Sequence, residues 1–370
     1  MPKPRKSPRA TTRARSRTKA AGNARPTIRA VAVRARVAVS TVSRVLNGGY
    51  ASEVVKGRVQ RAIQELGYAP SDTARSLVRG RTGSVGIVTH SRRSPWVSDV
   101  LAGMEATLAR GRYSVLLGSL LLEGTYDSST VSTWTRERRV DGLVFARYTR
   151  RERKLCDAAV AAGLPVVLLA PDVLHPAGFV VRCDNVRAGW LVAAHLASLG
   201  HRRIAYAAGP RDSLDSRDRL KGLRTELARR GVRMSATDVW QGGDYEHGGG
   251  VEFAARYLKL PKSARPTAVV AGNDAMALAF MRTVLQRGVK IPADLSVVGF
   301  DDISDAALYW PGLTTVHQPA YEMGSAACRV LLDRLAGRDP ELGSPIEYDV
   351  ELVVRESTAP PPTRRRARKS

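Results

Sequence analysis

The chain has 370 residues, of which 44% are hydrophobic and 25% charged, so it can bury the cores of about two or three packed units and is not a disordered chain. Its formal net charge is +25, which points to an anionic partner. Its three cysteines are far apart without CxxC spacing, which argues against a disulfide framework and a zinc site, and no apolar run is long enough to span a bilayer.

The positive charge lies at the two ends of the chain. Residues 1–82 contain 19 Lys/Arg against 3 Asp/Glu, and residues 363–370 add 5 basic side chains, whereas residues 83–362 are nearly balanced with 35 basic and 31 acidic. Because attraction to phosphates depends on local charge, we expect an N-terminal module that binds double-stranded DNA. An anionic membrane surface ranks behind DNA, since no basic stretch carries the bulky apolar face of an interfacial helix.

Residues 1–26 have no apolar periodicity and are expected to form a disordered basic tail. Residues 27–69 predict a compact all-α unit with helices at 27–36 and 38–47, followed by a longer one that Ser52 caps. Residues 70–82 form a linker that contains SDTARSLV, a helix capped by Ser71 and too short to be stable alone.

From Ser84 onward the pattern changes to short apolar runs separated by amphipathic segments of helix length. Runs of Val, Ile and Leu without alternation are typical of parallel strands buried on both faces. The strands are expected at SVGIVT, YSVLLG, DGLVFA, PVVLL, RIAYAAG, TAVVAG and LSVVGFD, with helices that include 98–110, 186–199, 217–230 and 274–287. This predicts an α/β region of two doubly wound parallel-sheet subdomains.

The second helix of the N-terminal unit lies in VAVSTVSRVLNGG, residues 37–49, where nearly every polar side chain is short. Short side chains let a helix backbone approach base edges, so the pair of helices fits a helix-turn-helix whose second helix enters the major groove. Its expected DNA contacts are Val39, Ser40, Thr41, Ser43, Arg44 and Asn47, with Thr27 at a phosphate. The alternative is a plain three-helix bundle with a Ser/Thr-rich surface, and the local charge favours DNA.

The segments TIRAVAVRARVAVSTVSRVLNG and ELGYAPSDTARSLVRGRTGSVGIV resemble the lactose/galactose-repressor family of transcription regulators. The resemblance continues through SLGHRRIAY, AGNDAMAL, VVGFDDI and LVVRESTAP and spans residues 27–360. It implies a bacterial homodimer that binds a near-palindromic operator, with an affinity set by a small ligand held in a periplasmic-binding-protein-like region. It also implies a hinge helix that folds on the minor groove, where Leu77 is the wedge and Ala74 packs beside it.

The resemblance also implies subdomain boundaries and shows two departures. The first subdomain is expected at 83–183 plus 319–345 and the second at 184–318 plus 346–358, followed by a basic tail at 359–370. In the helix-turn-helix, Arg36 stands where the family usually has Gly, and Ala38 stands where it usually has a Ser cap. Either the two departures cost stability in this unit, or Arg36 offsets the cost through a contact with a DNA phosphate.

Polar and aromatic side chains follow several predicted strands, where ligands of doubly wound sheets bind. The candidate effector contacts are Trp96, Arg147, Arg219, Tyr245, Asn273 and Asp301, which suit a polyhydroxylated, sugar-like ligand. By resemblance, Arg219, Asn273 and Asp301 contact the effector and Tyr245 stacks on its ring, while Asp184 and Asn185 lie near the cleft. Each also has a purely structural alternative, such as Asn273 capping the next helix.

The expected cavity also departs from the family. Ala170-Pro171 replaces a common Asp-Arg pair, and the residues from Leu120 to Leu122 are apolar where polar ones are usual. A less polar effector, an acidic effector drawn to Arg147 and Arg219, or no effector would each fit.

The chain lacks the phosphate-loop, dinucleotide, zincin and nucleophile-elbow motifs, so neither an enzyme nor a cofactor is expected. With no signal-peptide pattern, the protein is expected in the cytoplasm, and a tail without heptads favours a dimer over a tetramer. The alternatives are the same DNA-binding regulator under a protein corepressor or without effector, and, more weakly, a cytoplasmic sugar-binding protein or an enzyme.

Overall fold

The computed structural model describes residues 26–46, 48–69, 81–90, 94–122, 125–338 and 345–362. The chain divides into two compact units, one ending at Arg79 and one beginning at Gly80. The disordered tail predicted for 1–26, the hinge helix and the end of the basic C-terminal tail lie essentially outside the described residues. So do Asn47, Ser71, Ala74 and Leu77.

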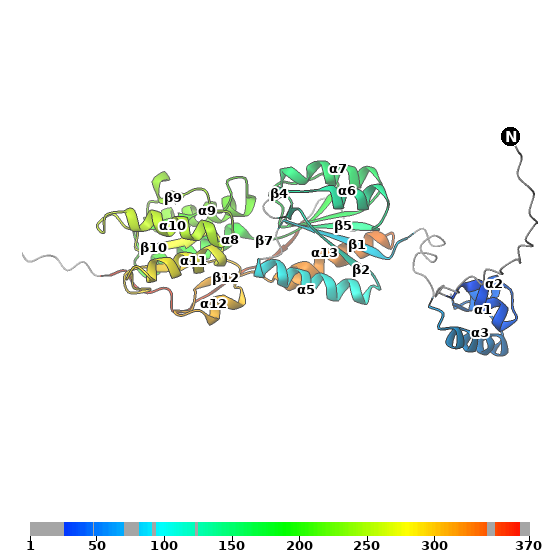
Figure 1. The fold of residues 1–370 in the computed structure, drawn as a ribbon. Helices are drawn as coiled ribbons and strands as arrows, with labels where there is room; N and C mark the ends of the chain where they lie inside the picture. Colours follow the sequence, from blue (N-terminus) through cyan, green and yellow to red (C-terminus); the bar gives the residue numbers. More distant parts are fainter. Residues whose placement is uncertain are drawn as a thin grey trace, which may run out of the picture. The chain divides into compact units, whose positions relative to one another are not determined.

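The N-terminal unit consists of α1 (Ile28–Ala35), α2 (Val39–Leu46) and α3 (Glu53–Leu66), shown in blue in Figure 1. The apolar stripes meet in a small core formed by Val31, Ala32, Ala35, Val42, Val59 and Ala62. Thr27 Oγ1 accepts a hydrogen bond from Ala30 N at 3.3 Å and so caps α1, and Ser52 Oγ caps α3 through Val55 N at 3.4 Å. The predicted helices are therefore confirmed.

Arg36 forms the turn between α1 and α2 in the left-handed conformation, with φ 52° and ψ 51°. A side chain in this conformation costs about 1–2 kcal/mol, which a glycine avoids. The Arg58 guanidinium offsets part of that cost because it donates to the carbonyls of Ala35 at 2.6 Å and Arg36 at 2.9 Å. A side chain from α3 thus stabilises the strained turn.

The second unit contains a parallel sheet with the strand order β13-β7-β6-β5-β1-β2. These strands are β1 (Ser84–Thr89), β2 (Ser114–Ser119), β5 (Gly142–Ala146), β6 (Val166–Leu169), β7 (Gly178–Cys183) and β13 (Ile346–Tyr348). Helices α5 (Pro95–Arg110) and α13 (Ala320–Leu335) cover one face, and α6 (Ser129–Arg136) and α7 (Arg153–Ala161) cover the other (Figure 1). The short pair β3 (Leu121–Leu122) and β4 (Thr125–Tyr126) follows β2. We call this part the N-lobe.

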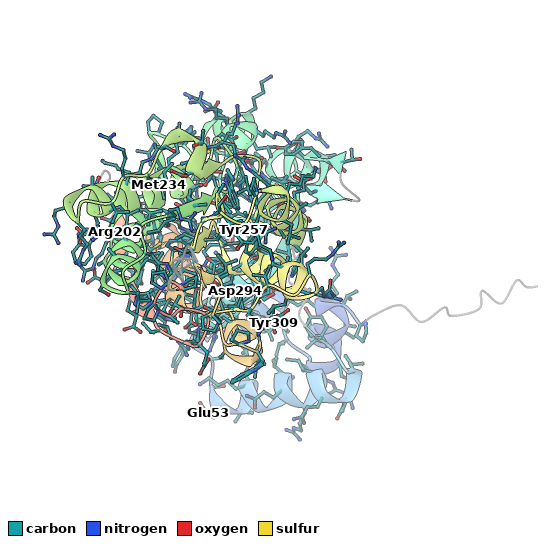
Figure 2. The ribbon with its side chains drawn as sticks, turned by 90° about the vertical axis from the view of Figure 1, so that its left-hand side faces the viewer. Glu53, Arg202, Met234, Tyr257, Asp294 and Tyr309 are labelled. Carbon is teal, nitrogen blue, oxygen red and sulfur yellow. The ribbon has the colours of Figure 1, made fainter. Side chains whose placement is uncertain are left out.

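The C-lobe is built on a second parallel sheet with the order β11-β10-β8-β9. Its elements are α8 (Asn185–Ser198), β8 (Ile204–Ala207), α9 (Leu214–Arg229), β9 (Val239–Trp240), α10 (His247–Lys259), β10 (Ala268–Ala271), α11 (Asp274–Leu285), β11 (Ser296–Val298) and α12 (Ser304–Leu308). Helix α8 packs on α9, and α10 packs on α11, where Tyr257 meets the edge of Phe280 at a ring distance of 5.8 Å (Figure 2). Two doubly wound halves were predicted, and the structure confirms them.

The chain crosses between the lobes at 183–185, at 317–320 and at 348–351. Strands β12 (Thr315–His317) and β14 (Glu351–Val353) pair antiparallel beside these crossings. The predicted boundary at 346 is wrong, because β13 pairs with β7 of the N-lobe through Ile346 and Val181. As a short, exposed edge strand, β13 carries no apolar run that the sequence pattern could reveal.

Every apolar run expected as a strand forms one, whereas the sequence pattern missed β7 and the short strands β3, β4, β9, β12, β13 and β14. The burial of β7 alternates along the strand, so it lacks the continuous apolar run of its neighbours. Among the described residues, no helix is both long and apolar enough to cross a membrane.

Replacing Arg36 by glycine and Ala38 by serine should stabilise the N-terminal unit. The first change removes left-handed strain of about 1–2 kcal/mol, and the second adds a helix cap of about 0.5–2 kcal/mol at the residue before α2. Calorimetry of the isolated fragment 1–82 should show Arg36→Gly/Ala38→Ser melting higher, by about 4–8 °C per kcal/mol gained.

The matched control is Gly67→Ala, because Gly67 ends α3 in the same left-handed conformation with φ 59° and open space around its Cα. This variant should melt lower than the parent fragment. An unchanged melting temperature of the double variant would contradict the strain assigned to the turn.

Candidate functional site

Helix α2 turns one face to the core and the other outward. Val42 is fully buried, while Val39 is 41% exposed and both Ser40 and Arg44 are exposed. Thr41 and Ser43 are half-buried at the edges of the same face. The helix therefore presents short side chains and one long cation, which is the surface that the sequence analysis expected.

The Arg44 side chain lies over the backbone that ends the helix. A Cβ placed on Gly49 would come within 2.6 Å of Arg44 Cγ, and Gly49 N donates to Arg44 O at 2.8 Å. Gly49 therefore provides the space in which the arginine stem packs, and the exposed guanidinium is held near the C-terminal end of α2. Arg29 and Arg36 are also exposed on this unit, whereas Arg34 pairs with Glu65 at 2.5 Å.

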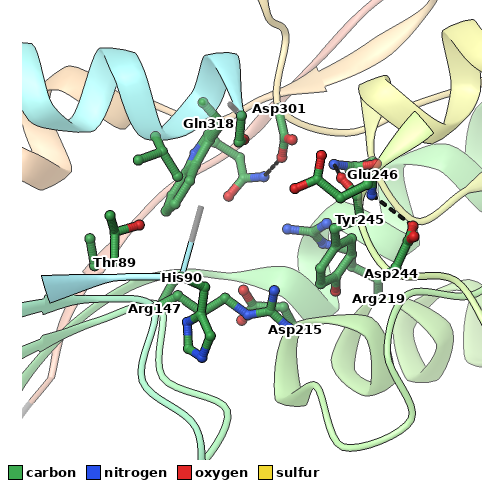
Figure 3. Close-up of a pocket in the computed structure, with 16 residues that line it drawn as sticks. Thr89, His90, Arg147, Asp215, Arg219, Asp244, Tyr245, Glu246, Asp301 and Gln318 are labelled. Carbon is green, nitrogen blue, oxygen red and sulfur yellow. Dashed lines mark hydrogen bonds between the residues drawn. The ribbon is translucent and has the colours of Figure 1, made fainter. Parts of the chain in front are cut away.

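In the second unit, one cavity of about 680 Å³, including the part open to solvent, lies between the two lobes. All of the predicted effector contacts line it, namely Trp96, Arg147, Arg219, Tyr245, Asn273 and Asp301. The N-lobe supplies its part from α5 and from the ends of β1, β5 and β6. The C-lobe supplies its part from α9, from the loop between β9 and α10, and from the residues that follow β10 and β11 (Figure 3). The carboxyl ends of both parallel sheets thus face a common space.

Arg219 is the buried centre of the C-lobe side, with an exposed fraction of 4%. Its Nε donates to Asn185 Oδ1 at 2.7 Å, its Nη1 donates to Gly272 O at 2.7 Å, and its guanidinium lies 4.8 Å from the centre of the Phe300 ring. Helix α9 brings Arg219 this close to α8 because Gly189 lies against the Arg219 carbonyl, where any Cβ would clash. The guanidinium is thus fixed on both sides.

Two half-buried carboxylates, Asp215 and Asp301, lie near Arg219, and the fully buried Asp274 lies near Asp301. Burial raises the pKa of Asp301 to about 7, although the neighbouring Arg219 charge lowers it. Burial likewise raises the pKa of Asp215, and Asp274 has a strongly raised pKa because burial is reinforced by the nearby Asp301. Asp301 Oδ1 accepts from Gln318 Nε2 at 2.7 Å, and Asp215 Oδ1 accepts from Asn185 Nδ2 at 2.9 Å.

Asn273 and Tyr245, which also belong to the C-lobe side of the cavity, are hydrogen-bonded to each other. Asn273 Oδ1 caps α11 by accepting from Met276 N at 3.0 Å, and its Nδ2 donates to Tyr245 O at 3.0 Å. The Tyr245 hydroxyl lies 2.9 Å from Ser213 Oγ. Asn273 therefore caps α11, as its structural alternative predicted, and it also lines the cavity.

Arg147 extends from the end of β5 toward Tyr245, as Figure 3 shows, and its guanidinium lies 5.1 Å from the centre of that ring. Its Nε and Nη2 both lie 3.4 Å from Oδ2 of the buried Asp172, whose other oxygen accepts from Leu214 N of the C-lobe at 3.1 Å. Burial raises the pKa of Asp172 despite the Arg147 charge. Arg147 and Asp172 thus contact the C-lobe from the N-lobe side.

Backbone strain is concentrated at this cavity. Arg147, Ala170, Tyr245 and Asp301 all line it, and their φ angles are 71°, 44°, 66° and 120°. Positive φ in residues other than glycine costs free energy and is typical of functional sites.

The sequence analysis missed several side chains of the cavity. Thr89 is the last residue of β1 and His90 follows it, Asp215 lies in the first turn of α9, and Gln318 lies in a lobe crossing. The rule that ligands bind beyond strand ends would have found the first two. The helix expected over 98–110 begins earlier, at Pro95, which suits a first helical position, so Trp96 lies in the first turn of α5.

The ligand-free protein should become more stable at high pH when Asp301 is replaced by asparagine. The folded pKa of about 7 lies above the ordinary value of ~3.9, so this carboxyl stabilises the fold at low pH and loses that contribution as the pH rises through about 7. Calorimetry of the full chain should therefore show that the melting-temperature gain of Asp301→Asn is larger at pH 8 than at pH 5. We expect about 2–4 °C per kcal/mol relieved.

The exposed Asp99, on α5 outside the cavity, provides the matched control. Asp99→Asn should show no comparable pH dependence. A gain for Asp301→Asn that is equal at both pH values would contradict the raised pKa.

Comparisons with known proteins agree with this architecture. Residues 27–71 match the model of bacterial regulatory proteins of the lacI family, and residues 193–358 match a periplasmic binding protein-like domain. The HTH-type transcriptional repressor PurR of Photobacterium profundum is 31% identical over 336 residues, which cover 90% of this chain and 98% of that protein.

Solved structures share the fold. A lac repressor dimer bound to operator and the anti-inducer ONPF has a TM-score of 0.76 and 28% identity, covering 90% of this chain and 99% of its own. A complex of the transcriptional regulator CelR with cellobiose has a TM-score of 0.66 and 30% identity, covering 90% and 100%. The chain therefore belongs to the lacI family of bacterial transcription regulators, in which a helix-turn-helix unit is joined to a periplasmic-binding-protein-like effector domain.

Proposed function

We propose that α2 enters the major groove of an operator and that Val39, Ser40, Thr41, Ser43 and Arg44 contact the DNA. The outward face of α2 supports this, because its short side chains allow close approach and Arg44 is the long donor suited to guanine or phosphate. Thr27 lies at the N-terminus of α1, where a backbone N–H and a hydroxyl suit a phosphate. Asn47, Ser71, Ala74 and Leu77 extend this proposal into residues outside those described.

We further propose that a small, sugar-like effector binds the cavity between the lobes and changes operator affinity. The observation that carries this is the direct hydrogen bonding between cavity residues and two lobe crossings. Gln318 accepts from Cys183 Sγ at 3.0 Å and donates to Asp301, and Asn185 joins Arg219 to Asp215. A ligand that contacts Arg219 and Asp301 therefore acts on the segments about which the lobes move.

The protein is inferred to act as a homodimer in the cytoplasm and to release its effector unchanged. The lac repressor neighbour is a dimer on its operator, and exposed apolar side chains such as Leu308 (82% exposed) and Trp310 (81%) offer a surface for a second copy. Control by a protein corepressor, or DNA binding without any effector, remains the second candidate. This second candidate is favoured by Ala170, which stands at the cavity where the family commonly has a polar side chain.

Replacing Arg44 by alanine should weaken binding to the specific site more than binding to random DNA. A good contact to a base is worth about 1–3 kcal/mol of discrimination, which corresponds to roughly 5- to 150-fold in affinity. The measurement is a filter or fluorescence titration with duplexes that the protein retains from its own genome, against random competitor. Lys56→Ala on α3, where Lys56 pairs with Glu53 at 2.7 Å, is the matched control and should keep the specificity ratio.

Operator affinity measured with and without a panel of sugars and related metabolites tests the effector proposal. One compound should change the affinity, by about 5- to 150-fold for a typical allosteric coupling, and either sign supports the proposal. Affinity that stays constant across the panel, while the specific DNA is still recognised, would favour the protein corepressor or an effector-free regulator.

A further inference from the structure

The two sides of the effector cavity differ in charge. The described polar side chains on the N-lobe side are Thr89, His90, Ser94, Trp96 and Arg147, and no carboxylate lines the cavity there. The C-lobe side and the adjoining crossing carry Asp215, Asp244, Glu246 and Asp301 around Arg219. The N-lobe wall therefore mainly donates hydrogen bonds, whereas acceptors dominate the opposite wall.

Trp96 on the N-lobe side has an unmet donor. Its indole Nε1 is buried and has no hydrogen-bond partner among the described residues. An indole N–H can only donate, and leaving it buried without an acceptor costs free energy. A bound ligand that places an oxygen at this N–H would satisfy it.

His90 is the second unsatisfied group of this wall. Its Nε2 lies 3.2 Å from Oε1 of the fully buried Glu152, and Thr149 donates to the other Glu152 oxygen through its N at 2.7 Å and its Oγ1 at 2.6 Å. Burial opposes ionisation of Glu152, but the hydrogen bonds from His90 and Thr149 prevail and lower its pKa to about 2. The other ring nitrogen of His90, Nδ1, is buried without a partner within the described ranges.

Among the described residues that line the N-lobe wall, Arg147 carries the permanent positive charge. Its guanidinium lies 3.4 Å from a single oxygen of Asp172, which is a long contact for a charge-assisted bond. Asp172 and Glu152 are both buried behind the wall and do not line the cavity. Asp172 therefore orients the Arg147 guanidinium, and Glu152 lies beside the His90 ring, without either carboxylate presenting negative charge to a ligand.

We propose that the effector is an acidic sugar, that is, a polyhydroxylated compound with one anionic group, a carboxylate or a phosphate. Its anionic oxygens lie at Arg147 and the Trp96 N–H, and its hydroxyls donate to the carboxylates around Arg219. The opposite orientation would place the anion against Asp301 and Asp215, so the charge pattern also fixes the direction of binding. This inference rests on the proposed role of the cavity as the effector site.

Calorimetric titration of the full, DNA-free chain at about 0.15 M salt tests the inference. Neutral sugars, D-glucose, D-ribose and cellobiose, are compared with D-glucuronate, D-gluconate, glucose 6-phosphate and ribose 5-phosphate. At least one anionic compound should bind at least about tenfold more tightly than every neutral one, because an anionic oxygen forms a charge-assisted hydrogen bond with Arg147 that a neutral hydroxyl does not. The comparison of carboxylates with phosphates then identifies the anionic group.

Two variants assign the preference to the N-lobe wall. Arg147→Gln should reduce the ratio of anionic to neutral affinity toward one, and Trp96→Phe, which keeps a ring but removes the N–H, should reduce it partially. Arg151→Gln is the matched control, since Arg151 is exposed and lies outside the cavity. It should leave the ratio as in the parent chain.

Neutral sugars that bind as tightly as the anionic ones, a failure of every anionic compound to bind, or a ratio that survives Arg147→Gln would each overturn the inference. A failure of the acidic-sugar inference can be told apart from a failure of the proposed regulatory function. A neutral sugar that changes operator affinity keeps the function and rejects the acidic ligand. An anionic sugar that binds without any effect on operator affinity keeps the ligand class and rejects the regulation.

Discussion

The buried guanidinium of Arg219 is the interaction on which the effector unit depends. It lies among Asp215, Asp301 and Asn185. Removing such a charge from water costs free energy, and this cost is offset only when the N–H groups are hydrogen-bonded and opposite charges lie near. Close approach of α8 and α9 at Gly189 and Gly222 places it there. Without Arg219, the neighbouring carboxylates would be buried without a counter-charge, and breaking a buried pair of this kind typically costs about 3–5 kcal/mol.

The same cluster links the ligand site to the connections between the lobes. Asn185 and Gln318 belong to chain crossings, and each is hydrogen-bonded to a cavity carboxylate. A change in the charge or position of Asp301 therefore alters a contact of the crossing itself, not only a contact of the C-lobe. This proximity gives a local physical basis for effector control, because coupling needs a ligand that interacts differently with two arrangements of the lobes.

The DNA-binding unit is held together by a small core and a few hydrogen bonds. Its core includes short side chains such as Ala32, Ala35 and Ala62, so little apolar area is buried. Strain in a single turn is therefore a large fraction of the stability of this unit. Arg36 holds a strained left-handed turn that Arg58 supports from α3. Apart from Arg44, the exposed face of α2 carries short side chains.

The sequence by itself determined the element types, the helix-turn-helix, the paired parallel sheets and the effector candidates from Trp96 to Asp301. These follow from local periodicity, capping residues and the position of polar groups after apolar runs, which are properties of short segments. Even the unfavourable turn at Arg36 was visible in this way.

Tertiary structure alone decided the lobe to which residues 346–348 belong, the start of α5 at Pro95, and the roles of Glu152, Asp172, Asn185 and Gln318 behind the cavity. An edge strand pairs according to its neighbours in space, and a buried polar group is satisfied by partners far away in the chain, as Gln318 is by Cys183. Sequence periodicity describes which face of an element is buried, but only the packed chain determines which groups meet there.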